Sequence, residues 1–93
     1  MKIVINTCHG GFGLSKEALD LFNERSGTNI LYYNTEHIER NNPILVEIVE
    51  QLGKAAHGQF AVLKVVEIPD DVVWGIEEYD GNEWIAEKHR TWN

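Results

Sequence analysis

The chain has 93 residues, of which 43% are hydrophobic and 25% charged, with two prolines and one cysteine. This composition excludes a disordered, collagen-like or low-complexity protein and indicates one small globular domain over residues 1–93. Fifteen acidic side chains against eight basic ones give a net charge of −7. DNA or RNA is therefore not expected as the principal partner, because both are polyanions.

The single cysteine, Cys8, excludes an intrachain disulfide, and no Cys/His spacing typical of a metal site is present. No apolar run reaches the roughly 18–20 residues that span a bilayer. The polar residues after Ile5 do not fit a signal peptide. We therefore expect a cytoplasmic protein with no metal, no cofactor and no membrane partner.

The first predicted unit is a strand, a glycine-rich loop and a helix. Residues 2–7 contain the β-branched run Ile-Val-Ile, which favours a buried strand. The loop Cys-His-Gly-Gly-Phe-Gly follows, and Ser15 is a good N-cap for a helix that begins at Lys16. Gly27 is suited to end this helix in the left-handed conformation.

The second unit is predicted to contain another strand and another helix. Residues 29–33 have strand composition, and residues 34–42 are polar and typical of a loop. Asn42 followed by Pro43 predicts a helix N-terminus, because proline at the first helical position loses no hydrogen bond. Apolar residues then recur at helical spacing, and Gly58 is expected to end the helix.

Three strands are predicted in the C-terminal part of the chain. Residues 59–68, 72–79 and 82–91 have strand composition, and the last two are joined by a short turn. The predicted order is therefore β-α-β-α-β-β-β. This order defines an α+β fold in which two helices pack on a sheet of about five strands, with a C-terminal β-hairpin.

The turn of that hairpin presents a conflict between its geometry and its charges. Asp80-Gly81 is a pair preferred in two-residue hairpin loops, since both central residues need positive φ. A two-residue loop places Glu78 opposite Glu83, and like charges in that position repel. Either the loop is longer or a cation lies nearby, and we favour the longer loop.

The segment from Cys8 to Ser15 is the strongest candidate binding site. Three glycines in four residues let backbone N–H groups approach a ligand, and the helix N-terminus that follows adds partial positive charge. This combination favours a phosphate or pyrophosphate. Glu36 lies at about the distance at which a Rossmann-type site places an acid on a ribose hydroxyl, although Lys16 replaces the third glycine of that motif. A tight turn that needs positive φ is the alternative interpretation. The candidate ligand-binding residues here are Cys8, His9, Gly10, Gly11, Phe12, Gly13 and Ser15.

Three side chains of this segment each allow two interpretations. His9 fits a donor to phosphate or a catalytic acid or base, and equally a structural role. Cys8 fits a small buried hydrophobe better than a nucleophile, because Cys8 and His9 point to opposite faces of an extended segment. Phe12 fits a plug folded onto the core better than a ring stacked on a ligand.

The C-terminal run from Glu87 to Trp92 is the second candidate region. Side chains alternate along a strand, so Arg90 and Trp92 share one face. An arginine beside an aromatic ring suits a phosphate or a nucleobase, and both residues therefore join the candidate ligand-binding set. A solvated last strand or a subunit contact is the alternative. The candidate catalytic residues, if the ligand is turned over, are His9, His89 and Glu87.

Aromatic residues outside these two regions carry weaker signals. Trp74 and Trp84 lie in the predicted hairpin and are expected in the core or at an interface. Tyr32, Tyr33 and Arg40 could border a site at the end of the predicted second strand, but nothing in their spacing singles them out.

The chain resembles a widespread group of small bacteriophage and prophage proteins, above all in the motifs KIVINTCHGGFGLS (2–15) and EKHRTW (87–92). The similarity also includes a proline-initiated helix, residues 65–71 and residues 78–81, whereas residues 27–41 match weakly. The resemblance implies a phage origin, and hence the host cytoplasm, without implying a reaction. Small phage proteins include oligomeric sponges that sequester the nucleotide signals of bacterial immune systems, an analogy of class that assigns no residue.

Three functions are compatible with these features. The leading expectation is a homo-oligomer that binds a phosphate-bearing small molecule, a nucleotide derivative, through the glycine loop and sequesters it. One alternative is a small nucleotide-cleaving enzyme that uses His9 or His89. The other is a protein-interaction module that acts on a host factor through exposed tryptophans and its acidic surface.

Overall fold

The β-branched run near the N-terminus forms strand β1 (Lys2–Asn6), whose last four residues are buried. The structure is a computed structural model and describes residues 1–87. β1 pairs in antiparallel fashion with β2 (Leu63–Glu67), and β3 (Trp74–Tyr79) pairs in the same way with β4 (Asn82–Glu87). The described residues thus form an α+β fold with four strands in two two-stranded sheets, so the prediction of one sheet of about five strands is wrong.

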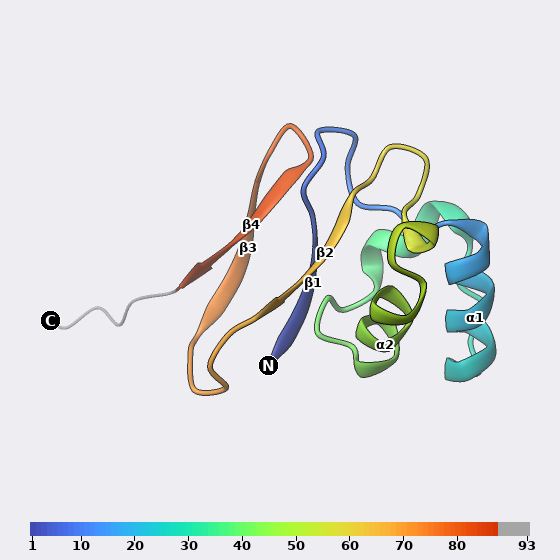
Figure 1. Cartoon of the computed structure of the whole chain (residues 1–93), viewed down its shortest axis with the longest axis horizontal. Helices are drawn as coiled ribbons and strands as arrows, with labels where there is room; N and C mark the ends of the chain where they lie inside the picture. The colour runs from blue at the N-terminus through green and yellow to red at the C-terminus, as the bar shows by residue number, and fades with distance from the viewer. Residues whose placement is uncertain (88–93) are drawn as a thin grey trace, which may run out of the picture.

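The elements form three layers, as Figure 1 shows. Helices α1 (Lys16–Ser26) and α2 (Pro43–Leu52) lie on one side of the β1–β2 pair, and the β3–β4 hairpin lies on the other. Val4 and Leu63 belong to the main hydrophobic core together with the helices. Ile3 and Ile5 are also buried, and they point to the opposite face of β1 because side chains alternate along a strand. β1 is covered on both faces, which explains its unbroken apolar run.

Both helices begin where the sequence predicts. The Ser15 hydroxyl accepts a hydrogen bond from the N–H of Ala18 at 3.1 Å, and Gly27 ends α1 at φ 68°. Asn42 caps α2 through its side-chain oxygen, with Pro43 in the first turn. The predicted caps are thus confirmed. They could be predicted because each depends on contacts within a few residues.

The second helix ends earlier than the predicted Gly58. Gly53 adopts φ 56° and ends α2, and the chain continues as the 3₁₀ turn η2 (Gly53–Ala56). The following strand begins at Leu63 instead of residue 59. Residues 58–61 form a turn in which the N–H of Ala61 donates to the carbonyl of Gly58 at 3.1 Å. The N–H of Val62 then donates to the Asn6 side chain at 2.9 Å instead of to a backbone carbonyl, so the regular ladder begins at Leu63.

The predicted strand over residues 29–33 is absent, and a 3₁₀ helix, η1 (Tyr32–His37), occupies part of this region and of the predicted loop. The Asn23 side chain, on α1, accepts from the N–H of Ile30 and donates to its carbonyl. These bonds use the backbone groups that a strand would offer to a neighbour. The order is therefore β-α-η-α-β-β-β, and tertiary contacts override the strand propensity of this segment.

The C-terminal hairpin has the two-residue turn, and our preference for a longer loop is wrong. Asp80 and Gly81 have φ angles of 52° and 89°, as a type I′ turn requires, and Glu78 lies opposite Glu83. The alternative that the sequence left open, a nearby cation, is what the structure contains: Arg40 binds Glu83. The predicted continuation of the last strand over residues 88–91 lies outside the described residues.

Candidate functional site

The glycine-rich loop between β1 and α1 is packed closely against two other loops. In Figure 1 it lies between the turn of the β3–β4 hairpin and the segment that precedes β2. A Cβ on Gly10 would overlap the backbone of Phe60, and a Cβ on Gly58 would lie 2.7 Å from the carbonyl carbon of Gly13. Gly11 has φ 92°. Close backbone approach and one positive φ thus account for much of the glycine content of these loops.

Asn6, at the end of β1, connects these three loops. Its side chain is fully buried. The amide nitrogen donates to the carbonyls of Cys8 and Gly81 at 2.7 and 2.8 Å, and the amide oxygen accepts from the N–H groups of Cys8 and Val62. Two donated and two accepted bonds match the capacity of one side-chain amide well. Asn6 therefore holds the glycine loop against the hairpin turn.

A buried ion pair lies beside this junction. Glu83 of β4 and Arg40 expose only 8% and 14% of their side chains. Both terminal nitrogens of Arg40 bind the carboxylate, with Nη2–Oε2 at 2.9 Å, and the carboxylate also accepts from the N–H of Asn6 at 2.8 Å. The pairing is bidentate, which is a strong geometry for these two groups. The repulsion expected between Glu78 and Glu83 is thereby offset.

The same two residues cover the free edge of β1. The N–H of Val4 donates to the backbone carbonyl of Arg40 at 2.8 Å, and the N–H of Asn6 donates to Glu83. The guanidinium carbon of Arg40 also lies 3.7 Å from the centroid of the Phe12 ring, a cation–π contact. Phe12 itself packs against the core. The ion pair thus ties β1, the glycine loop and the hairpin together.

A depression with a volume of ≈ 510 Å³ opens above this ion pair. Its lining comes from the glycine loop, from η1 and the residues just after it, and from the hairpin. The lining residues are Gly10, Gly11, Phe12, Glu36, His37, Arg40, Glu78 and Glu83. Backbone amides, a guanidinium, an imidazole and carboxylates therefore converge on one surface hollow. His37 and Glu36 are both exposed, with Nε2 of the histidine 4.0 Å from a carboxylate oxygen. This hollow, named here the loop depression, is our candidate site because polar groups of several kinds meet in it.

The candidate residues from the sequence are distributed unevenly around the loop depression. Gly10, Gly11 and Phe12 line it. Cys8 is half-buried and His9 exposed, and neither belongs to the lining. The Ser15 hydroxyl is engaged, since it donates to the carbonyl of Ala55 and caps α1.

The remaining candidates lie elsewhere or beyond the description. Gly13 borders a smaller neighbouring pocket. Glu87 is exposed at the end of β4 and pairs with Trp74. His89, Arg90 and Trp92 lie outside the described residues.

Sequence reasoning did not single out the residues at the centre of the site. It named Arg40 only as a residue that could border a site at the end of the predicted second strand, and it assigned no role to His37 or to the Asn6 side chain. One signal did exist: the like-charge pair Glu78–Glu83 called for a cation near the hairpin. The sequence alone did not indicate which of the basic residues supplies it.

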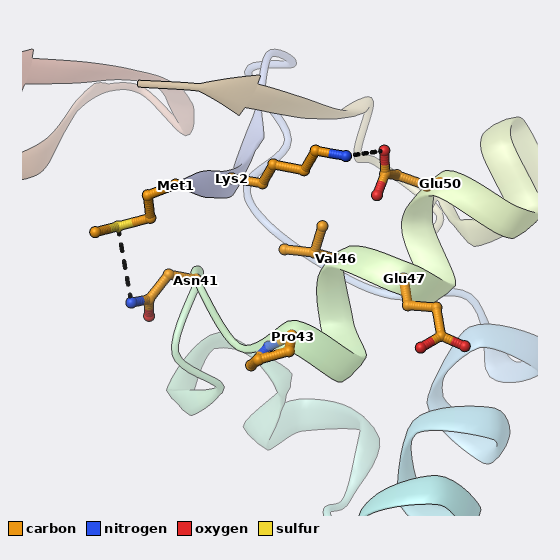
Figure 2. A pocket seen from close by; sticks show the side chains of 7 residues that line it. All are labelled: Met1, Lys2, Asn41, Pro43, Val46, Glu47 and Glu50. Atoms are coloured by element: carbon orange, nitrogen blue, oxygen red, sulfur yellow. Dashed lines mark hydrogen bonds and ion pairs between the residues drawn. The ribbon is translucent and has the colours of Figure 1, made fainter. Parts of the chain in front are cut away.

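A second hollow, of ≈ 400 Å³, lies near the N-terminus beside α2 (Figure 2). Its charged groups are already paired: Lys2 binds Glu50 at 3.0 Å, and Glu47 binds Arg25. The hydrogen bond to Glu50 and the charge of that group raise the pKa of Lys2 above its ordinary value. Lys2, Glu47 and Glu50 are thus each engaged in an ion pair. The loop depression remains the candidate because its lining includes the glycine loop.

Comparison of the chain with models of protein families, with curated proteins and with solved structures finds no match. Over residues 1–87, no group of three or more His, Cys, Asp or Glu side chains is arranged to hold a metal ion. In the same part of the chain, every helix is too short or too polar to cross a bilayer.

Proposed function

We propose that the loop depression binds a phosphate-bearing small molecule, a nucleotide derivative, and that the protein acts by holding this ligand. The observation that carries the proposal is the meeting of the glycine loop with Glu36 in one hollow. Their spacing in the sequence suggested a phosphate loop with a ribose-binding acid. The fold brings these two elements together although the chain is not a dinucleotide-binding domain.

The residues that line the depression include donors for a phosphate. Within residues 1–87, the N–H groups of Gly10 and Phe12 donate to no protein acceptor. The guanidinium of Arg40 has five N–H donors, of which Glu83 uses only some. His37, on the rim, adds an imidazole that becomes a second cation when protonated.

The lining of the depression also includes acceptors. Glu36 and Glu78 are exposed carboxylates that line the same hollow, and carboxylates accept hydrogen bonds from the hydroxyls of a sugar. They also repel additional negative charge. We therefore expect a ligand with one phosphate or a phosphodiester, and weaker binding of a triphosphate.

Sequestration in a homo-oligomer is part of the proposal. The resemblance to small phage proteins supports it, and so does the modest core of a chain of this size, to which a subunit contact would add. The oligomeric state is measured by size-exclusion chromatography with light scattering.

The function is tested by incubating the protein with nucleoside mono-, di- and triphosphates and cyclic dinucleotides. Free and heat-released molecules are then quantified by mass spectrometry. We expect depletion of a mononucleotide or cyclic dinucleotide with recovery of the intact molecule. New products would instead indicate the cleaving enzyme, and the absence of any depletion would contradict the proposal.

The site is tested with two exposed histidines. His37→Ala, in the depression, is expected to weaken binding about tenfold through loss of one charge-assisted hydrogen bond. His9→Ala removes a histidine outside the lining and is the matched control, with binding expected to remain as in the wild type. Equal effects of the two variants would contradict the placement of the site.

A further inference from the structure

A smaller pocket of ≈ 170 Å³ adjoins the loop depression. Its lining consists of Phe12, Gly13, Tyr32, Tyr33, Thr35 and Glu36. Phe12 and Glu36 line both hollows, so the two lie side by side, and we treat them as two halves of one groove. One half of the combined groove is polar and charged, and the other half is aromatic.

The aromatic half presents tyrosine rings that are largely exposed. Tyr32 and Tyr33 show relative exposures of 55% and 73%. The 3₁₀ helix η1 holds them in place, with the Thr35 hydroxyl donating to the carbonyl of Tyr32 at 3.3 Å. A single exposed aromatic ring is common on protein surfaces and needs no explanation. Two neighbouring exposed rings beside a pocket instead indicate a binding surface.

The tyrosines, and not Phe12, offer the free ring surface. One face of Phe12 is covered by the guanidinium of Arg40, and the ring packs against the core. Aromatic rings that remain exposed beside a groove are typical platforms for stacking of nucleobases, and stacking tolerates any base because every base has a π-face.

We propose that the pocket at Tyr32 and Tyr33 is the base-binding subsite of the groove, so that the ligand is a nucleotide with an intact base. This inference rests on the proposed function of the loop depression. Glu36 stands where the two halves meet, which is where the ribose of a nucleotide lies between its phosphate and its base. The polar half then holds the phosphate and the aromatic half selects for the base.

The inference is tested by isothermal titration calorimetry with the four common nucleoside 5′-monophosphates and with ribose 5-phosphate. At least one nucleotide is expected to bind about five- to a hundredfold more tightly than ribose 5-phosphate, because stacking on one aromatic ring has this effect. Tyr33→Ala should remove most of that difference and leave the affinity for ribose 5-phosphate unchanged. Tyr33→Phe should restore the difference, because it keeps the ring.

The matched control is Tyr79→Ala, which removes a tyrosine of 74% exposure that lines neither hollow. It should leave all affinities unchanged. If ribose 5-phosphate binds as tightly as every nucleotide, the base subsite is overturned while the phosphate site stands. If the difference persists when both Tyr32 and Tyr33 are replaced by alanine, the base lies elsewhere and the inference is again overturned. If neither class of molecule binds, the proposed function fails and the subsite fails with it.

Discussion

Arg40→Met is expected to lower the free energy of unfolding by about 3–5 kcal/mol, because it leaves a buried carboxylate without its charge partner. Glu83 is 8% exposed, so water replaces the guanidinium only in part. After the substitution only the N–H of Asn6 remains bound to the carboxylate. For a chain of 93 residues, the total stability is about 5–14 kcal/mol at the usual value per residue. The loss is therefore a large fraction of the whole.

The double variant Arg40→Met with Glu83→Leu separates the charge effect from the packing effect. It removes both charges and leaves the N–H of Asn6 without an acceptor, which costs about 1–3 kcal/mol. The double variant should therefore be more stable than Arg40→Met alone, as found for buried pairs replaced by apolar residues. Additive losses from the two single substitutions would contradict this reasoning.

Urea denaturation followed by tryptophan fluorescence measures these differences, with the m-value checked for constancy. The matched control is Arg25→Met, which breaks the more exposed pair with Glu47 and should change stability by no more than about 1 kcal/mol. A loss below about 1 kcal/mol for Arg40→Met would refute the argument that the ion pair clamps the hairpin to β1.

Three further predictions follow from the same structure. Gly58→Ala should lower the free energy of unfolding by about 1–3 kcal/mol, because the new Cβ would lie 2.7 Å from the backbone of Gly13. The control is Gly13→Ala, whose Cβ would have its nearest neighbour at 4.0 Å. It should change the free energy of unfolding by less than about 1 kcal/mol in the same urea titration. Asn6→Ala should cost about 2–4 kcal/mol and accelerate amide hydrogen exchange in the glycine loop; unchanged exchange would count against its role as a junction. The hydrogen bond from the N-terminal ammonium lowers the pKa of Asp70 below its ordinary value of 3.8. The ion pair between the two groups therefore stabilises the folded state above pH 3.8, and this stabilisation is lost as the pH falls through the lowered pKa. The Tm of Asp70→Asn should therefore lie slightly below that of the wild type at neutral pH and equal it in strong acid, and a difference that persists in acid would exclude the ion pair as its cause.

Local chemistry in the sequence was sufficient to place the main elements. Ser15, Gly27 and Asn42 act on backbone groups within a few residues, so the starts of both helices and the end of the first could be predicted. The Asp80-Gly81 turn depends only on its own φ angles, and the hairpin was predicted for that reason. The glycine loop was predicted to be a binding site for a similar local reason, and this stays a prediction.

Other features depend on contacts between distant residues, and only the tertiary structure decided them. Ile30 lost its predicted strand because the Asn23 side chain binds its backbone. Arg40 became central because the fold brings it to Glu83, 43 residues away in the sequence. Burial then makes that pairing strong, since a carboxylate removed from water needs a partner. A sequence shows which residues carry charge, but the distances and the exclusion of water that determine the strength of each interaction arise only when the chain has folded.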